Sequence, residues 1–327
     1  LILSKDRSPI RTLADCVERF FEGVITSVHI LPFFPYSSDR GFSVIAFEEV
    51  DPQLGTWDDV AELEDDFKLM FDGVFNHISS KSYWFQQFLA GNPEYEDFFT
   101  VFSSKTAISE EHLKLILRPR TSPVLSQFQT INGPRWVWTT FSEDQVDLNF
   151  KNPLVLLKIF RILLGYVRHG ADLIRLDAIT YLWRELGTNC IHLEETHEVV
   201  KLLRDVFDIA CPHVAIITET NVPHDENITY FGDGTDEAQM VYNFALPPLV
   251  LHTCLTGDST VLSNWAKELV PPSDTTSFFN FLDSHDGIGL MGARGYLSDA
   301  EITNLCDMVK DRGGFISMKD NGDGTQS

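Results

Sequence analysis

The stretch Asp172-Leu-Ile-Arg-Leu-Asp177 decides the fold of this chain of 327 residues, because it is a short apolar run set between two helical patterns. These patterns run from Pro153 to Arg168 and from Leu193 to Ala210. The same alternation of short apolar runs with helical patterns continues in both directions, which is typical of repeated βα units. The sequence therefore predicts an α/β fold built on a parallel sheet.

About six strands are expected, each followed by a polar loop. They are Ser27 to Leu31, Lys68 to Phe75, Asp172 to Leu176, Val214 to Thr218, Gln239 to Tyr242 and Ser277 to Leu282. The further expected helices are Pro9 to Phe21, Thr56 to Leu63 with Thr56 as its cap, and Ser298 to Arg312.

One interval between two expected strands is much longer than the others. The chain runs 105 residues from Asp72, at the end of one strand, to Asp177, at the end of the next, whereas a βα unit takes roughly 30–40. The extra residues are rich in aromatic side chains and proline. We expect an inserted, irregular subdomain at residues 79–141, with the two parts of the main domain at 1–78 and 142–327.

The chain is strongly acidic, with 48 acidic and 25 basic side chains and a formal net charge of −23. This argues against nucleic acids and anionic membranes as partners, since both need basic patches. No apolar run reaches the ~18 residues of a membrane helix, and we expect no signal peptide, because charged residues follow Leu1-Ile-Leu3 at once. The five cysteines are scattered, without a Cys-x-x-Cys pair, so we expect buried or half-buried thiols in a cytoplasmic protein.

No Gly-rich phosphate loop, metal-ligand cluster or dinucleotide fingerprint occurs, so neither a cofactor nor a metal is expected.

Carboxylates recur where the expected strands end, at Asp72, Asp177, Glu219, Asp283 and Asp286. In parallel α/β folds the carboxyl ends of the strands carry the active site. A single acidic residue there is usually a helix cap, but several together favour catalysis.

Arg175 and Asp177 are the first such pair. Strand side chains alternate, so both point to the same face. The guanidinium is expected to lower the pKa of Asp177, which suits a nucleophile that must be charged at neutral pH. The alternative is a buried structural ion pair.

Glu219 ends the next strand, in Ile216-Ile-Thr-Glu219. Neighbouring strands lie ~4.8 Å apart, so the carboxyls of Asp177 and Glu219 are expected roughly 5 Å apart. Retaining glycosidases place their two carboxyls ~5–5.5 Å apart, and inverting ones ~6.5–9.5 Å. The spacing favours a retaining mechanism in which Glu219 holds its proton more tightly beside a charged Asp177. Two unrelated caps remain the alternative.

Two further motifs join these residues, Asp72-Gly-Val-Phe-Asn76-His77 and His285-Asp286. With them the sequence resembles the α-amylase clan of glycoside hydrolases, whose signatures are Asp-x-x-x-Asn-His, Gly-x-Arg-x-Asp-Ala, a strand-end Glu and His-Asp. All four occur here in order, except that an aspartate or alanine stands where the second has its glycine.

The resemblance covers residues from about 27 to 286, and it implies a TIM (β/α)8-type barrel with an insertion after the third strand. Such a barrel needs eight strands. We therefore expect the first strand before residue 1, and the last strand and a C-terminal β domain after residue 327.

Within the clan the sequence is most similar to sucrose phosphorylases and their relatives. The stretches that carry this likeness are Leu31-Pro-Phe-Phe-Pro-Tyr-Ser-Ser-Asp-Arg-Gly-Phe-Ser43, Arg118-Pro-Arg120 and Trp136-Val-Trp-Thr-Thr-Phe-Ser-Glu-Asp-Gln-Val-Asp147. The resemblance implies Asp177 as nucleophile, Glu219 as acid/base, Asp286 as transition-state stabiliser, a glucose pocket of Asp39, Phe42, His77, Arg175 and His285, and Phe141 on the acceptor side.

Each pocket residue also has a structural alternative. Phe42 could belong to the core, Asp39 to a turn, and His77 could be a buried histidine with satisfied hydrogen bonds. Taken as a set, they favour the functional interpretation.

Arg118 and Arg120 are the candidate residues for binding an anion such as phosphate. Opening a glucosyl-enzyme with phosphate brings a dianion into a pocket of three carboxylates, which is repulsive unless a cation is present. Arginine suits this role because it binds phosphate through two parallel hydrogen bonds. The resemblance assigns the role to Arg120, and the alternative is a solvated surface arginine.

The sequence thus predicts a retaining α-glucosyl phosphorylase that transfers glucose from sucrose or a related α-glucoside to phosphate and releases α-glucose 1-phosphate. One alternative is a hydrolase or transglucosidase of the same clan. Another is a non-catalytic amylase-like scaffold, which the retained carboxylates disfavour. Sucrose, sucrose 6-phosphate and glucosylglycerate all remain open as donors.

Overall fold

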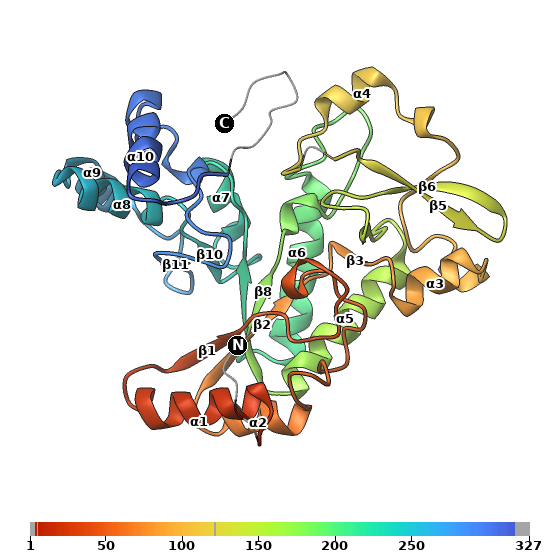
Figure 1. Ribbon diagram of the computed structural model, residues 1–327, viewed down its shortest axis with the longest axis horizontal. Helices are drawn as coiled ribbons and strands as arrows, with labels where there is room; N and C mark the ends of the chain where they lie inside the picture. The colour runs from red at the N-terminus through yellow and green to blue at the C-terminus, as the bar shows by residue number, and fades with distance from the viewer. Residues whose placement is uncertain (1–3, 5, 121, 318–327) are drawn as a thin grey trace. The chain divides into compact units, whose positions relative to one another are not determined.

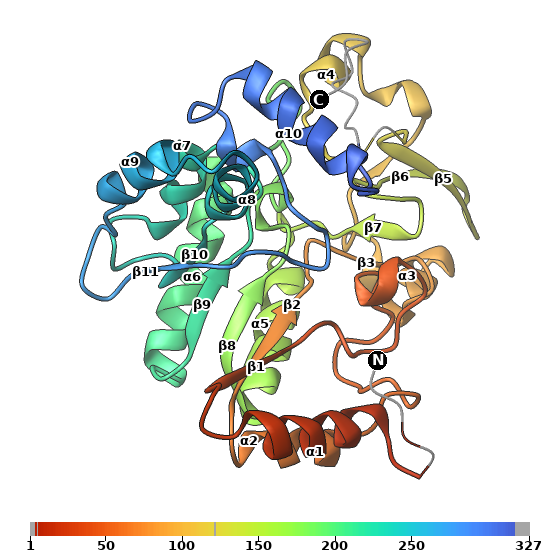
Figure 2. The same cartoon turned by 60° about the vertical axis from the view of Figure 1, so that its left-hand side comes forward.

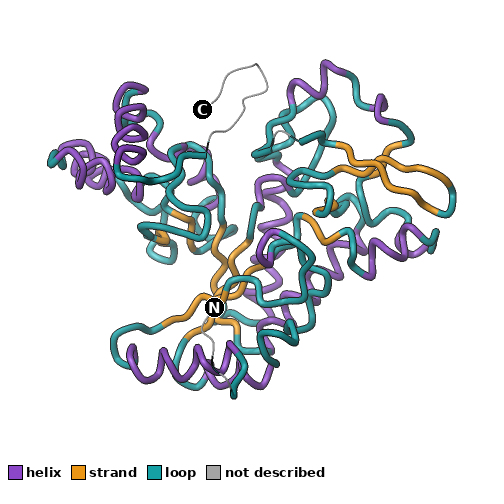
Figure 3. The backbone as a smooth tube through the Cα atoms, in the orientation of Figure 1, coloured by secondary structure: helices purple, strands orange, loops and turns teal. Residues whose placement is uncertain are grey.

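The structure is a computed structural model that describes residues 4, 6–120 and 122–317 (Figures 1 and 3). The chain divides into two compact units. The first comprises Leu1–Thr196 and Val206–Ala215, and the second comprises His197–Asp205 and Ile216–Ser327. The strands expected before residue 1 and after residue 327 lie outside the described residues.

Three parallel strands form the centre of the first unit, in the order β1, β2, β8. They are β1 (Ser27–Ile30), β2 (Lys68–Gly73) and β8 (Ala171–Leu176), and Figure 2 shows them side by side. The register of β2 and β8 places Asp72 beside Arg175. Two chemically complementary side chains are thereby brought to the same level at the carboxyl ends of adjacent strands.

The helices of this unit begin where the sequence supplies a cap. They are α1 (Pro9–Phe21), α2 (Trp57–Glu64) and α5 (Pro153–Arg168), and α6 (Glu194–Ala210) is shared with the second unit. Ser8 caps α1, and Thr56 and Asp59 form a capping box on α2. Asn152 caps α5, which has Pro153 in its first turn. Such caps satisfy backbone N–H groups that the first helical turn leaves free.

The insertion after β2 is more regular than the sequence suggested. Its elements are α3 (Tyr83–Leu89), β4 (Val101–Phe102), α4 (Glu110–Leu115), β5 (Leu125–Thr130) and β6 (Gly133–Trp138). The three strands form an antiparallel sheet in the order β4, β6, β5. The turn between β5 and β6 ends at Asn132-Gly133, where Gly133 has a positive φ of 98°. Thr130 pairs with Gly133, so Ile131 and Asn132 form the two-residue turn, and the insertion contains one regular hairpin besides its loops.

A second antiparallel pair joins the two ends of the insertion to each other. Strand β3 (His77–Ser79) pairs with β7 (Gln145–Asp147), with His77 opposite Asp147 and Ser79 opposite Gln145. All six residues of the pair are buried. Polar side chains from both ends of the insertion therefore meet in the interior of the first unit.

Aromatic side chains make up much of the core of the first unit. Phe34 stacks on Tyr166 of α5 with ring centroids 4.9 Å apart, and Phe33 meets Phe71 of β2 edge-on at 5.1 Å. In the insertion, Phe85 of α3 packs edge-on against Phe128 and Phe99. Edge-to-face and offset aromatic pairs add to the free energy of hydrophobic burial.

The second unit has its own parallel strands, with β10 between β9 and β11. Its elements are β9 (Ala215–Thr218), α7 (His224–Asn227), β10 (Met240–Tyr242), α8 (Leu246–Thr256), α9 (Thr260–Glu268), β11 (Ser277–Phe279) and α10 (Asp299–Asp311). A core cluster of Ala245, Leu249, Trp265, Ala293 and Leu297 packs α8 and α9 together.

All six expected parallel strands and all five expected helices are present, with ends that differ by at most three residues. The five cysteines are free, but Cys254, in the last turn of α8, is exposed rather than buried. No helix in the described part of the chain is long and apolar enough to cross a membrane.

Candidate active site

A buried arginine joins two carboxylates at the ends of β2 and β8. Arg175 Nη1 donates a hydrogen bond to Asp177 Oδ1 at 2.8 Å and another to Asp72 Oδ1. His29 of β1 completes the cluster, with Nε2 at 2.8 Å from Asp72 Oδ2. Asp72 is 0% exposed, Arg175 2% and Asp177 9%. The predicted Arg175–Asp177 ion pair is therefore present, and Asp72 shares its guanidinium.

The pKa of Asp177 moves in the opposite direction from the one expected. Burial raises it, and this effect outweighs the lowering by Arg175, while the nearby charge of Asp72 raises it further. The sequence could reveal the guanidinium but not the loss of solvent around the carboxyl. For Asp72 burial is again the largest effect, but Arg175 and His29 together outweigh it and lower its pKa.

These pKa shifts predict how kcat/KM falls at acidic pH. If Asp177 must be ionised to react, kcat/KM falls as the pH drops through its pKa, and this limb is expected above the ordinary value of ~3.9. The variant Asp72→Asn removes a neighbouring negative charge, so it is expected to move the limb to lower pH. The measurement is kcat/KM of the whole protein between pH 4 and 8, with Asp58→Asn, on the exposed side of α2, as control. A limb that moves to higher pH, or does not move, contradicts this assignment.

Next to the cluster, the structure gathers the residues expected in the glucose pocket that belong to the first unit. The ring centroid of His77 lies 5.0 Å from that of Phe141, and His77 Nε2 lies 2.9 Å from the carbonyl oxygen of Phe42. The guanidinium carbon of Arg175 lies 5.9 Å from the ring centroid of Phe42. These contacts bring Phe42, His77 and Phe141 together near Arg175.

Two residues of this site were not singled out from the sequence. Gln145 Nε2 donates to Asp39 Oδ2 at 2.9 Å and lies 3.4 Å from the carbonyl oxygen of Phe42, so one amide holds both pocket residues. Tyr181 meets Phe141 edge-on, with ring centroids 5.5 Å apart. Gln145 stands within a stretch that resembles sucrose phosphorylases, which was the available signal.

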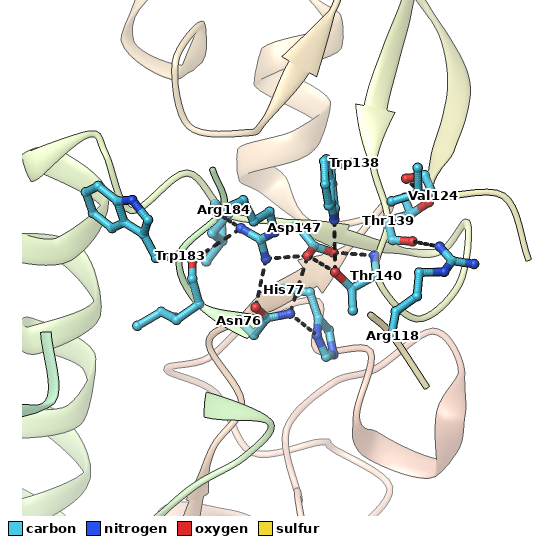
Figure 4. A network of polar contacts seen from close by, with 12 residues as sticks. Asn76, His77, Arg118, Val124, Trp138, Thr139, Thr140, Asp147, Trp183 and Arg184 are labelled. Carbon is cyan, nitrogen blue, oxygen red and sulfur yellow. Dashed lines mark hydrogen bonds and ion pairs between the residues drawn. The ribbon is translucent and has the colours of Figure 1, made fainter. Parts of the chain in front are cut away.

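A buried polar network connects both ends of the insertion to the loop after β8 (Figure 4). Arg184 donates to the carboxylate of Asp147 and, at 2.8 Å, to Asn76 Oδ1. Thr140 donates to Asp147 through its backbone N–H at 2.9 Å. Asn76 Nδ2 donates to His77 Nδ1 at 3.3 Å, which leaves the Nε2–H of His77 to donate to Phe42. The network thus fixes the orientation of the His77 ring.

The two arginines of the insertion have different surroundings. Arg118 is half-buried, and donates to the carbonyl oxygens of Thr139 at 3.2 Å and of Arg120 at 3.0 Å. Arg120 is exposed. Because the Arg118 guanidinium holds the backbone of Arg120, the two arginines cannot be treated as independent neighbours.

The remaining predicted residues belong to the second unit. Glu219 directly follows β9 and is half-buried. His285 Nε2 lies 3.2 Å from Asp286 Oδ2, and the side chain of Asp286 is 74% exposed. Asp283 is also exposed. The separation of ~5 Å between Asp177 and Glu219 stays a prediction from strand spacing.

The described residues contain no group of three or more His, Cys, Asp or Glu side chains placed to hold a metal ion. The first unit offers buried carboxylates, arginines and aromatic rings. A buried carboxylate beside hydrogen-bonding groups and aromatic rings is a suitable site for a sugar whose anomeric carbon meets a nucleophile.

Comparison with known proteins bears on this chemistry. The protein-family model described as "Alpha amylase, catalytic domain" matches residues 23–287 of this chain. A glucosylglycerate phosphorylase of Spirochaeta thermophila is 54% identical over 96% of this chain and 53% of its own length. A sucrose phosphorylase of Streptococcus mutans is 32% identical over 95% of this chain and 64% of its own. The chain thus spans about half the length of the first of these relatives.

A solved structure shows the same arrangement of the backbone. The crystal structure of sucrose 6F-phosphate phosphorylase from Thermoanaerobacter thermosaccharolyticum superposes with a TM-score of 0.86 at 26% identity, over 98% of this chain and 67% of that one.

Proposed function

Because the chain belongs to the α-amylase family, in its sucrose-phosphorylase-like subgroup, we propose that the protein is a retaining α-glucosyl phosphorylase whose donor is glucosylglycerate. The observation that carries this proposal is the buried Asp177, held by Arg175, whose guanidinium in turn lies 5.9 Å from the ring of Phe42. It has the features of a nucleophile placed beneath a glucosyl group.

In the first step Asp177 attacks the anomeric carbon, and the bond from this carbon to the leaving oxygen breaks. Glu219 gives its proton to that oxygen, so the leaving group departs as a neutral hydroxyl. Asp286 binds the sugar 2-hydroxyl and stabilises the oxocarbenium charge. In the second step a phosphate oxygen attacks the same carbon, the bond to Asp177 breaks, and Glu219 takes up the phosphate proton. Two inversions give net retention, so the product is α-glucose 1-phosphate.

The choice of donor rests on similarity. The named glucosylglycerate phosphorylase is much closer to this chain than the named sucrose phosphorylase. Glycerate, like phosphate, is an anion, and both need a cation in a protein with a formal net charge of −23. The exposed Arg120, whose backbone Arg118 holds, supplies such a charge on the insertion.

The test is an assay of the whole protein with glucosylglycerate, sucrose and sucrose 6-phosphate, each with and without phosphate. We expect phosphate-dependent release of α-glucose 1-phosphate, with the highest kcat/KM for glucosylglycerate. Free glucose released equally without phosphate would mean a hydrolase, and faster turnover of sucrose would overturn the assignment of the donor. A β-anomer as the first product would exclude the two-step mechanism.

The role of Arg120 can be separated from that of Asp177. If Arg120 binds the incoming phosphate, Arg120→Ala leaves formation of the glucosyl-enzyme nearly intact and slows only its opening by phosphate. Loss of a hydrogen bond to a charged group corresponds to about a ten- to hundredfold loss in phosphorolysis. Hydrolysis needs no cation and becomes the larger share of turnover. Arg120→Lys is expected to recover part of the loss, because a point charge cannot reproduce the planar fork.

The measurement is the ratio of glucose 1-phosphate to free glucose across a phosphate titration. Arg135→Ala is the matched control, since Arg135 lies on β6 of the same insertion and its Nη1 donates to the neighbouring Pro134 carbonyl. An unchanged ratio in Arg120→Ala would mean that Arg120 is a surface residue.

A further inference from the structure

The loop that carries Asp39 and Phe42 has a strained backbone. Asp39 and Arg40 are consecutive non-glycine residues with positive φ values of 54° and 52°. Gly41 follows with a φ of 114°, and a Cβ there would lie 2.7 Å from the carbonyl oxygen of Pro32. Left-handed conformations are costly for residues with a Cβ, and they persist only where the surroundings enforce them.

A single carboxylate enforces the conformation of this loop. Asp144, directly before β7, accepts hydrogen bonds from five serine hydroxyls. The donors to Oδ2 are Ser37, Ser38 at 2.5 Å and Ser43 at 2.8 Å, and the donors to Oδ1 are Ser80 at 2.7 Å and Ser79 at 3.4 Å. One oxygen therefore binds the two ends of the strained loop, and the other binds the end of β3.

The backbone adds to the same arrangement. Ser37 N–H donates to the carbonyl oxygen of Ser43 at 3.0 Å, which closes the loop at its base. Ser80 N–H donates to the carbonyl oxygen of Asp144 at 2.7 Å, which fixes the carboxylate to β3. The next residue along the chain, Gln145, holds Asp39 Oδ2. Two consecutive side chains thus hold the loop and the pocket carboxylate that it carries.

The charge of Asp144 strengthens these contacts. Hydrogen bonds to an ionised carboxylate are shorter and about twice as strong as those between neutral groups. Burial disfavours the charge of Asp144, but the serine hydroxyls outweigh this effect and hold its pKa below the ordinary value. The carboxylate therefore remains ionised at neutral pH and keeps its serine donors.

We propose that Asp144 is a positioning residue of the sugar pocket, which holds loop 37–43 in its strained conformation so that Asp39 and Phe42 meet the glucosyl group without rearrangement. This proposal rests on the proposed function for the identity of the sugar site. The loop and its carboxylate are fixed by contacts within the first unit. Preorganisation of this kind lowers the conformational-entropy cost of binding the sugar.

The experiment compares Asp144→Asn and Ser38→Ala with Ser80→Ala in the whole protein. Ser38 and Ser80 each donate one hydroxyl to Asp144, but Ser38 lies on the strained loop and Ser80 lies after β3. We expect Asp144→Asn to lower kcat/KM for the α-glucoside about tenfold or more, the factor for one lost hydrogen bond to a charged group. Ser38→Ala is expected to share this loss, and Ser80→Ala to keep kcat/KM within about twofold despite losing an equivalent bond.

Two further readouts separate positioning from general stability. Amide hydrogen exchange of residues 37–43 is expected to speed up in Asp144→Asn and Ser38→Ala but not in Ser80→Ala. Adding Arg40→Gly to Asp144→Asn is expected to restore several-fold of the lost kcat/KM, because glycine takes a positive φ without strain.

The outcomes are distinct. Equal kinetics and equal exchange in Asp144→Asn and the wild type overturn the positioning role, as does the same loss in Ser80→Ala as in Ser38→Ala. If Asp144→Asn does not fold, Ser38→Ala alone decides through its exchange and kcat/KM. If the wild type shows no phosphorolysis, the proposed function fails, while the exchange of residues 37–43 still tests how Asp144 holds the loop.

Discussion

Replacing Asp177 by asparagine is expected to abolish turnover while the protein remains folded. Asparagine retains an oxygen that accepts from Arg175, and Arg175 keeps its ion pair with Asp72, so the buried guanidinium is not left without a carboxylate. No covalent glucosyl-enzyme can form, however, because the amide oxygen is a poor nucleophile. Removal of a catalytic nucleophile in a serine protease costs on the order of 10⁶ in kcat, and a loss of this scale is expected here.

The matched control is Asp172→Asn on the same strand. Asp172 lies at the opposite end of β8, where it accepts from Leu69 N–H and contacts Lys68. It is expected to keep kcat within a few-fold, because asparagine can still accept from Leu69 N–H and position 172 lies at the other end of the strand from Asp177. Glu219→Gln gives a second comparison, because it should lose least with glucosyl fluoride, whose leaving group needs no proton. Near-normal rates for Asp177→Asn would show that another group is the nucleophile.

Replacing Arg184 by methionine is expected to destabilise the protein by about 3–5 kcal/mol, the usual cost of removing one partner of a buried ion pair. Arg184 is 8% exposed, and besides Asp147 and Asn76 it donates to the carbonyl oxygen of Leu148 at 3.0 Å. The variant leaves the fully buried charge of Asp147 without its guanidinium. It also loosens Asn76, which orients the His77 ring, so kcat/KM is expected to fall as well.

The neighbouring residue supplies the control. Glu185 pairs with Lys151 at 2.5 Å, but about half of each side chain is exposed. Exposed ion pairs contribute about 0.2–1 kcal/mol, so Glu185→Gln is expected to change the free energy of unfolding by no more than this. Both are measured by denaturant unfolding at neutral pH. Equal effects of the two substitutions would show that the buried network does not contribute as its geometry indicates.

Helix positions were predictable because the chain marks their starts. Ser8 with Pro9, Thr56 with Asp59, and Ser298 with Glu301 all act as caps in the structure. The ends of strands were harder to predict, because a strand ends where its hydrogen-bonded partner strand ends. The strand expected to reach Leu282 stops at Phe279, which is opposite Tyr242 at the end of β10.

The candidate site was predictable where its residues form short motifs and not where it depends on distant pairing. Arg175 and Asp177 lie two positions apart on one strand, so alternation alone placed them together. Asp144, Gln145 and Arg184 are polar residues that a sequence pattern assigns to the surface. Only the pairing of β3 with β7 places the first two beside the pocket loop. The pKa of Asp177 was misjudged for the same reason, because burial is a tertiary property.

The pairing of β3 with β7 gives the insertion a fixed base. The two strands hold both of its ends together through their own hydrogen bonds, so the segment between them is a closed loop anchored at a fixed root. The entropy of closing such a loop changes by only about 0.6 kcal/mol for each doubling of its length. A change of length within residues 82–138 is therefore expected to leave Asp144 and Gln145 in place, as long as Thr140, Phe141 and Ser142 keep their contacts with Asp147, His77 and Gln145. Such a change is expected to alter the surroundings of Arg118 and Arg120 without moving the loop of residues 37–43, which Asp144 and Gln145 hold.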